Sequence, residues 1–242
     1  MHTSYMDRFG KNSGLLHAYA DDNSPRESEI KPLYDEMNLQ KVQTVLNVPF
    51  EGNLLTQFVP NIEITLADFV VPDSLKDWNI VKTDYNLAGL PNTYFDVVLS
   101  MAGIHHLGNE EQLQFLSATR KVLKTHGRLL MAEVKDDSRT SRFLDKFVGK
   151  YTGSGHTGNY LKEDFVSVAA RAGYNTIKRE TIVCPWVFAN EDHLFKWMTK
   201  FFGLSNISKT ILLTQVGEIL GLNRENEVLT ANWELDFIFA KS

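Results

Sequence analysis

Short apolar runs alternate with segments of helical periodicity through the middle of the chain. The apolar runs are rich in β-branched residues and predict buried strands over residues 42–48, 62–67, 80–83, 95–100 and 128–134. The intervening segments predict helices or turns over residues 53–58, 72–78 and 110–123, the last of which we expect to end at Gly127. Strands that alternate with helices predict βαβ units and therefore a mostly parallel sheet.

The last third of the chain continues this pattern and then departs from it. A helix over residues 162–172, ended by Gly173, precedes a strand over residues 176–183. An aromatic-rich helical block over residues 190–222 separates this strand from a last strand over residues 233–240. Because the crossover between the two strands is long, the last strand is free to pair antiparallel to its neighbours.

These elements predict one α/β domain over residues 1–242. Residues 1–40 are expected to form a helical N-terminal cap, and residues 184–230 a helical lid inserted before the last strand. A chain of 242 residues with 43% apolar residues is long enough to bury a sizeable core. The chain has a single cysteine, Cys184, so it cannot form an internal disulfide, and this favours a reducing compartment. Cys184 lies in an apolar run, where it is expected to pack in the core.

Charge and hydropathy narrow the range of partners. The net charge of −5 disfavours a nucleic-acid substrate, because phosphate binding needs a basic surface. No run approaches the roughly 18 apolar residues of a membrane span, and the polar N-terminus lacks the apolar core of a signal peptide. We therefore expect a soluble cytoplasmic protein that acts neither on nucleic acid nor in a membrane.

Residues 84–107 carry the most specific motif of the chain. An acidic residue ends one strand, a turn follows, and a second buried strand leads into a loop with two adjacent histidines. Residues 90–100, 104–107 and 123–130 follow in an order and spacing that resemble class I S-adenosylmethionine-dependent methyltransferases. The resemblance implies a Rossmann-like fold with a mostly parallel seven-stranded sheet, an antiparallel last strand and helices on both faces. It also implies S-adenosylmethionine as the cofactor.

The same resemblance implies cofactor-binding roles at the ends of the predicted strands. Asp68 would accept hydrogen bonds from the ribose hydroxyls, and Asp84 from the adenine amino group, with Tyr85 beside it. Ser100 and Met101 would lie beside the cofactor's sulfur. The alternatives are that Asp68 caps a helix or lies in a loop and that Asp84 is a turn aspartate.

The loop after the first strand departs from the family pattern. Asn47 stands where the family has an acidic residue, and Pro49 and Glu51 stand where glycines let the backbone approach the cofactor. Proline also removes a backbone N–H donor. Gly52 would be the last glycine of a shortened loop. The departure concerns the half of the pocket that would hold the methionine part of the cofactor.

Three histidines are candidates for a catalytic base. His105 and His106 follow the fourth strand, and His156 lies in the glycine-rich residues 151–160, which form either a mobile loop over the pocket or a surface connection. One of the adjacent histidines could instead hold its loop in place. The three histidines and Glu133 could surround a metal, but adjacent histidines lack the i, i+4 spacing that directs two side chains to one ion. We therefore expect no metal site.

Aromatic residues are concentrated in the segment predicted as a lid. They are Trp186, Phe188, Phe195, Trp197, Phe201 and Phe202. They favour a hydrophobic small-molecule substrate, although a core or a homodimer interface would use the same residues. Near the N-terminus, Tyr5 and Phe9 could cover the cofactor or only cap the sheet.

Two functions remain open from the sequence. The first is an S-adenosylmethionine-dependent methyltransferase that acts on a small molecule, such as a metabolite or a natural-product intermediate. The alternative is a protein of the same fold that does not methylate, and that either catalyses another reaction such as cyclisation or acts as a binding subunit. The alternative rests on Pro49 and Glu51 in the loop after the first strand.

Overall fold

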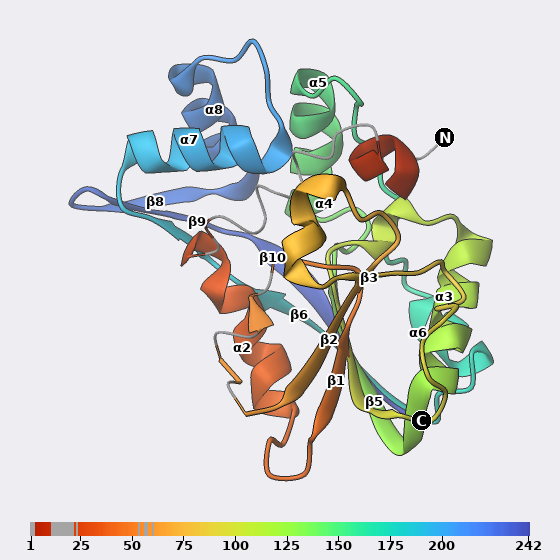
Figure 1. The fold of residues 1–242 in the computed structure, drawn as a ribbon. Coiled ribbons are helices and arrows are strands. Elements are labelled where there is room, and N and C mark those ends of the chain that lie inside the picture. The colour runs from red at the N-terminus through yellow and green to blue at the C-terminus, as the bar shows by residue number, and fades with distance from the viewer. Residues whose placement is uncertain (1–2, 11–21, 23, 53, 56–57, 60) are drawn as a thin grey trace.

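The computed structural model describes residues 3–10, 22, 24–52, 54–55, 58–59 and 61–242. These residues form a seven-stranded sheet with helices on both faces, and a three-stranded sheet beside it (Figure 1). None of the helices in this part of the chain is long and apolar enough to cross a membrane.

The large sheet has the strand order β3-β2-β1-β4-β5-β10-β6. Its strands are β1 Thr44–Asn47, β2 Glu63–Asp68, β3 Val81–Lys82, β4 Phe95–Met101, β5 Leu123–Glu133, β6 Thr176–Val183 and β10 Glu234–Lys241. Strands β1 to β5 are parallel, and β10 lies antiparallel between β5 and β6. The predicted Rossmann-like fold with an antiparallel last strand is confirmed.

Alternation along the buried strands divides the core into two layers. The helices that cover the two faces of the sheet are α2 Glu27–Glu36 on one side, and α3 Asn109–Val122 and α6 Phe165–Arg171 on the other (Figure 1). In β4, Val97 and Leu99 pack in the layer of α2, whereas Val98 packs in the layer of α3 and α6. Because the strands are parallel, the loops that follow β1, β2 and β4 meet at one edge of the sheet.

The remaining helical segments are mostly short. They are η1 Met6–Gly10, η2 Ser24–Arg26, η4 Asp73–Trp78, η5 Ile104–His106, α4 Arg139–Arg142, η6 Phe143–Val148, α5 Gly149–Tyr151, α7 Glu191–Phe202, α8 Lys209–Gln215 and η7 Val216–Leu220. The helix predicted over residues 53–58 lies partly outside the described residues, and Leu54, Leu55 and Phe58 are not α-helical.

One helix end differs from the prediction. Helix α3 ends at Val122 and β5 begins at Leu123, so Gly127 lies within the strand and does not end the helix. The backbone of residues 93–95 already pairs with that of residues 121–123. Pairing with the neighbouring strand therefore decides where the helix stops, before the glycine signal is reached.

The segment over residues 184–230 contains strands as well as the predicted helices. Its small sheet is made of β7 Trp186–Phe188, β9 Val228–Ala231 and β8 Leu222–Glu225, in that order. The hairpin of β8 and β9 turns through Asn226, at φ 54°, and Glu227. Because this turn is Asn-Glu and not Asn-Gly, the sequence carries only a weak hairpin signal.

Candidate functional site

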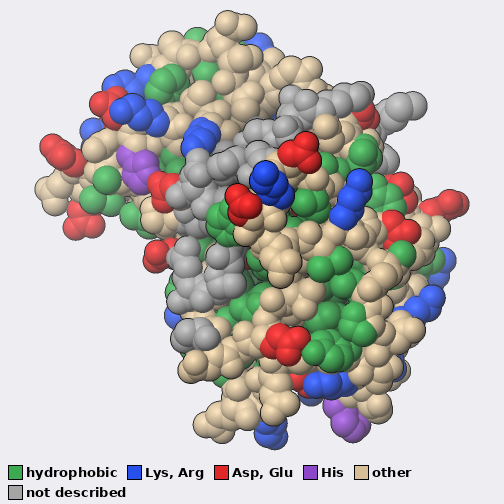
Figure 2. Space-filling model, in the orientation of Figure 1, with side chains coloured by type: hydrophobic (Ala, Val, Ile, Leu, Met, Phe, Trp, Pro, Cys, Tyr) green, Lys and Arg blue, Asp and Glu red, His purple; other side chains and the backbone are tan. Residues whose placement is uncertain are grey.

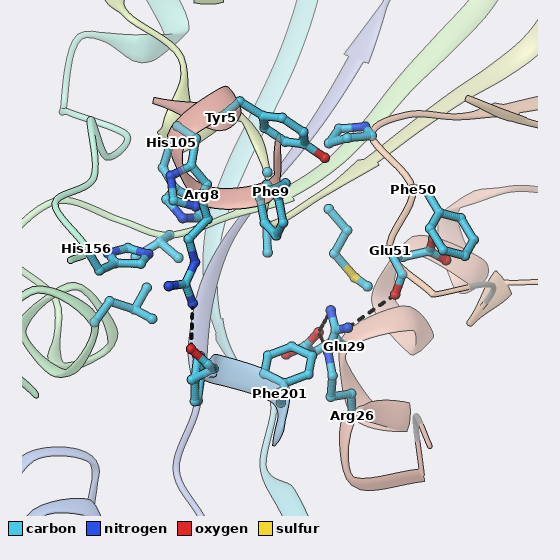
Figure 3. Close-up of a pocket in the computed structure, with 18 of the residues that line it drawn as sticks. Tyr5, Arg8, Phe9, Arg26, Glu29, Phe50, Glu51, His105, His156 and Phe201 are labelled. Carbon is cyan, nitrogen blue, oxygen red and sulfur yellow. Dashed lines mark hydrogen bonds and ion pairs between the residues drawn. The ribbon is translucent and has the colours of Figure 1, made fainter. Parts of the chain in front are cut away.

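The carboxyl edge of the sheet carries a small cavity. Its lining comes from η1, from η2 and the start of α2, from the loops after β1, β4 and β5, from η6 and the segment of His156, and from the inserted segment (Figure 3). The cavity volume is about 40 Å³. The site residues predicted from the sequence that lie in its lining are Pro49, Glu51, Met101, His105, His106 and His156.

Asp68 ends β2 as predicted, but protein groups surround its carboxylate. Its Oδ2 accepts hydrogen bonds from the Tyr5 hydroxyl at 2.9 Å and from the Phe50 backbone N–H at 3.0 Å. Its Oδ1 accepts a hydrogen bond from the Val70 N–H at 2.8 Å. Burial raises the pKa of Asp68 to about 7, although these hydrogen bonds oppose the shift. The Tyr5 hydroxyl thus lies where the sequence predicts a ribose hydroxyl.

The loop after β1 is filled by its own side chains. Asn47 Nδ2 donates to Glu51 Oε2 at 2.7 Å, and Glu51 Oε1 accepts from the Leu55 N–H at 3.3 Å. The ring of Pro49 packs against Gly103, where a Cβ atom would lie 2.3 Å from Pro49 Cγ. The loops after β1 and β4 are therefore in direct contact, in the region predicted to hold the methionine part of a cofactor.

A buried ion pair lines the side of the cavity away from the histidines (Figure 3). The Arg26 guanidinium contacts Glu29 Oε2 through Nε at 2.9 Å and through Nη2 at 2.8 Å. Its Nη1 donates to the Glu51 carbonyl oxygen at 3.3 Å. Glu29 Oε1 accepts from Trp186 Nε1 at 2.6 Å. Each charge of the pair is thus compensated inside the protein.

His105 and Glu133 form a buried dyad. His105 lies in η5, directly after β4, and its Nδ1 is 2.7 Å from Glu133 Oε1. Glu133 also accepts backbone hydrogen bonds from Ile104 at 2.8 Å, His105 at 3.3 Å and Val134 at 2.7 Å. These donors stabilise the carboxylate without solvent, and the carboxylate fixes the orientation of the imidazole.

His106 and His156 lie beside this dyad. His106 Nδ1 is 3.0 Å from the Thr3 carbonyl oxygen, and His156 Nδ1 is 3.3 Å from Asp145 Oδ1. Burial holds the pKa of His106 well below its usual range and lowers the pKa of His156 to about 4. Both rings are therefore neutral near pH 7. The ring centres lie 4.2 Å apart for His105 and His106, 5.5 Å for His105 and His156, and 5.0 Å for His106 and His156.

Hydrogen bonds tie the glycine-rich segment around His156 to the rest of the site. The Asn159 N–H donates to the His105 carbonyl oxygen at 2.7 Å, and the Leu161 N–H donates to the Val134 carbonyl oxygen at 3.0 Å. The Thr3 N–H donates to the Thr157 carbonyl oxygen at 2.7 Å. These bonds explain why His156 is buried although its segment is rich in glycine.

Asp84 makes the contacts of a turn aspartate. It is exposed, and its Oδ1 accepts hydrogen bonds from the N–H groups of Asn86 at 2.9 Å and Ala88 at 3.1 Å. It lies two residues after β3, which ends at Lys82, one residue earlier than predicted, and its hydrogen bonds serve the turn.

Tyr85, Ser100 and Gly52, which the sequence also predicts to bind the cofactor, are not among the residues that line the cavity. Tyr85 packs its half-buried ring edge-on against Phe69, with ring centres 4.8 Å apart. Ser100 is buried, and its Oγ has no hydrogen-bond partner among the described residues. Gly52 has φ 95°, a conformation in which a side chain would be strained.

Several functional candidates have no strong sequence signal. They are Arg8, Arg26, Glu29, Asp145 and Tyr160. Arg26 and Glu29 belong to a polar stretch that resembles a solvated helix start, and Asp145 is an isolated acid within a helical segment. Their roles depend on tertiary contacts that local patterns do not encode.

The surface in view is mixed in charge. In Figure 2, Lys and Arg side chains lie among Asp and Glu side chains and form no single-sign field. This distribution matches the modest net charge of −5.

A family model and solved structures resemble the chain. Residues 63–131 match the family model described as a methyltransferase domain. No curated protein matches the chain.

Three solved structures illustrate the likeness of the fold. An S-adenosylmethionine-dependent methyltransferase from Archaeoglobus fulgidus is 16% identical, covers 93% of this chain and 96% of its own, and has a TM-score of 0.57. The 1,6-didemethyltoxoflavin-N1-methyltransferase of Burkholderia thailandensis is 12% identical, with coverages of 97% and 90% and a TM-score of 0.52. Phosphoethanolamine N-methyltransferase 2 of Haemonchus contortus is 14% identical, with coverages of 98% and 59% and a TM-score of 0.57. At these identities the likeness establishes the fold.

Proposed function

We propose that the chain is a class I S-adenosylmethionine-dependent methyltransferase that transfers a methyl group to a small molecule, which the family model over residues 63–131 and the fold support. S-adenosylmethionine is the cofactor of this superfamily. The observation that carries the proposal is the position of Asp68 at the end of β2, with a hydroxyl group already bound to its Oδ2.

The polar groups around Asp68 fit the ribose of the cofactor. The Tyr5 hydroxyl stands in for a ribose hydroxyl, because it donates to the same carboxylate oxygen that would accept one. The cavity is too small for the cofactor, because its volume of about 40 Å³ is far below the roughly 300–1,000 Å³ of small-molecule pockets. Tyr5 and Phe9, both from the N-terminal segment, must therefore move for the cofactor to enter. Asp68, held by the Phe50 N–H, and Met101 would then hold the cofactor.

The chain's own residues supply positioning and a proton acceptor. The bound cofactor supplies an electrophilic methyl group, and transfer depends mainly on holding the acceptor in line with it. His105 is the best placed base, because Glu133 holds its Nδ1 and leaves Nε2 to accept a proton from the acceptor. The low pKa of His156, about 4, makes that residue a weaker base.

Aromatic walls favour a hydrophobic small-molecule acceptor. Trp186, Phe201, Phe202 and Trp233 line the cavity, and the rings of Trp186 and Trp233 stack with centres 4.0 Å apart. The Burkholderia thailandensis neighbour holds the small molecule 1,6-didemethyltoxoflavin together with S-adenosylhomocysteine, which is consistent with a small-molecule acceptor. A cytoplasmic location, the exclusion of nucleic-acid substrates and a homodimer remain predictions.

Ligand-dependent thermal stability tests this proposal. At about 100 times its dissociation constant, S-adenosylhomocysteine should add roughly 2.7 kcal/mol to the free energy of unfolding. Asp68→Ala should remove most of this shift, whereas Asp84→Ala, which alters an exposed turn, should keep it. If the wild-type protein shows no shift at millimolar ligand, the proposal is wrong.

The second candidate is a protein of this fold that does not methylate. Its support is the direct packing of Pro49 on Gly103 together with the buried Glu51, which occupy the methionine half of the pocket. A shift with S-adenosylhomocysteine but no methyl transfer from S-adenosylmethionine to any tested acceptor would favour it.

A further inference from the structure

The histidines on one side of the cavity form a convergent group. One ring nitrogen of each of His105, His106 and His156 lies within 4.8 Å of those of the other two, and all three residues are buried. It is the one group of this kind in the part of the chain that the structure describes. Although His105 and His106 are adjacent in the sequence, a ring nitrogen of each lies close to one of His156.

The hydrogen bonds of the rings define which nitrogen is available to a ligand. In each ring Nδ1 lies beside an oxygen that can only accept: Glu133 for His105, the Thr3 carbonyl for His106 and Asp145 for His156. Nδ1 must then carry the proton, and Nε2 keeps the lone pair. Metal-bound histidines are usually held in this way, by a carboxylate or a carbonyl behind the ring.

The distances between the ring nitrogens and the volume of the cavity suit one metal ion. Zinc–nitrogen bonds of roughly 2.0–2.1 Å in a tetrahedral site place ligand nitrogens about 3.3 Å apart, so nitrogens that lie within 4.8 Å of one another would close by at most about 1.5 Å. The cavity of about 40 Å³ is too small for the cofactor but exceeds the roughly 10–15 Å³ that a water molecule needs. A fourth ligand position is thus open to a water molecule or to a substrate atom.

The charges near the rings also suit a cation. The carboxylates of Glu133 and Asp145 stand behind two of the rings and outweigh the positive charge of Arg8. The other cation of the lining, Arg26, is paired with Glu29. The Arg8 guanidinium donates to the Phe202 carbonyl oxygen at 3.0 Å (Figure 3). Burial first, and the charge of Arg8 to a smaller extent, lower the pKa values of His106 and His156. Tyr160, a neutral side chain, donates its hydroxyl hydrogen to Asp145 Oδ1 and completes this environment.

We propose that His105, His106 and His156 bind one divalent transition-metal ion of the Zn²⁺ class through Nε2, with Glu133 and Asp145 as positioning residues. Imidazole ligands suit zinc, iron, nickel and copper, whereas magnesium and calcium prefer oxygen. The site does not depend on methyl transfer, and with an ion bound His105 Nε2 would be a ligand and not the proton acceptor of the proposed function. The proposal revises the expectation of no metal, which was drawn from residue spacing.

Metal titration of the full-length protein tests the site. After dialysis against a chelator, the wild-type protein should bind one equivalent of Co²⁺ with the visible absorption of a tetrahedral ion, and Zn²⁺ should displace it. His105→Ala and His156→Ala should each weaken binding about 100-fold or more, and Glu133→Gln about 10- to 100-fold. His126→Ala, at an exposed position on β5, is the matched control and should bind as the wild type does.

A second measurement needs no variant and therefore does not depend on the folding of a mutant. In NMR spectra of the wild-type protein, Zn²⁺ should shift the ring Nε2 signals of three histidines and leave that of His126 in place. An absence of saturable Co²⁺ absorption, unchanged affinity in His156→Ala, or unmoved Nε2 signals would each overturn the metal site. Because S-adenosylhomocysteine is absent from these experiments, their failure is distinct from failure of the proposed function.

Discussion

The two sides of the cavity are built on different principles. On the side of Asp68, protein groups already hold the carboxylate: Tyr5, Phe50 and Val70 donate three hydrogen bonds to it. On the histidine side, His105 and its two neighbours each use Nδ1 for the protein and keep Nε2 for another partner. The first side must exchange one partner for another to bind a ligand, whereas the second is arranged in advance.

This difference predicts unequal costs of binding. A ligand on the Asp68 side must displace the Tyr5 hydroxyl and move its segment, so part of the binding energy is spent on rearrangement. A ligand at the histidines needs only small movements of rings whose orientation is already fixed. Small ligands should therefore bind at the histidines without opening the rest of the cavity.

The largest expected effect is the loss of stability when the buried Arg26–Glu29 ion pair, which lies away from the histidines, is broken. Arg26→Ala should lower the free energy of unfolding by about 3–5 kcal/mol, because it leaves Glu29 charged and buried without its partner. Urea unfolding measures this loss. Lys31→Ala, which breaks an exposed ion pair with Asp35, should change stability by only about 0–1 kcal/mol. Equal losses in the two variants would contradict the buried role of Arg26.

A pH dependence should follow from Asp68. Its folded-state pKa, about 7, lies above its ordinary value of 3.8, so the folded protein binds the proton more tightly than the unfolded chain. The resulting stabilisation is fully present below about pH 4 and is lost as the pH rises through about 7. The shift of roughly three units corresponds to about 4 kcal/mol.

Asp68→Asn should remove this contribution. Urea unfolding between about pH 4 and pH 7, in the presence of a chelator, would compare the variant with the wild type. The stability of the wild-type protein should fall more steeply with rising pH than that of the variant. Parallel pH profiles would show that Asp68 is not the titrating group.

A smaller effect should come from the hydroxyl that occupies the ribose position. Tyr5→Phe removes a hydrogen bond to a buried carboxylate, and should lower stability by about 1.5–3 kcal/mol. The same substitution should strengthen S-adenosylhomocysteine binding, because Asp68 Oδ2 loses a donor that competes with the ligand. Each 1.4 kcal/mol gained in binding free energy corresponds to about a tenfold higher affinity. Isothermal titration calorimetry measures the change. Tyr94→Phe, which alters an exposed hydroxyl bonded to Glu63, should leave the affinity unchanged. Weaker binding in Tyr5→Phe would mean that the hydroxyl supports the ligand.

The sheet could be predicted from the sequence because its information is local. The apolar run of β4 and the acid that ends β2 place these elements without any knowledge of distant residues. The end of α3 was not predictable from Gly127, because strand pairing with residues 93–95 stops the helix first.

The site was predictable only in part, because its partners come from distant segments. Asp68 stands at its predicted strand end, but its hydroxyl partner lies 63 residues earlier, at Tyr5. The histidines were identifiable from the sequence, whereas their convergence depends on Thr3 and Asp145, which no spacing rule connects to them. Local patterns thus locate the functional groups, and tertiary contacts decide how they are used.

The contact between Pro49 and Gly103 constrains how this chain can evolve. A methyl group at position 103 would lie 2.3 Å from a carbon of the proline ring, and a ring fused to the backbone has little freedom to withdraw. Among descendants of this sequence, a side chain at position 103 should therefore arise only after the proline has been replaced. The two positions are expected to change as a pair and in that order, so Pro49→Gly would be the first step toward an open loop.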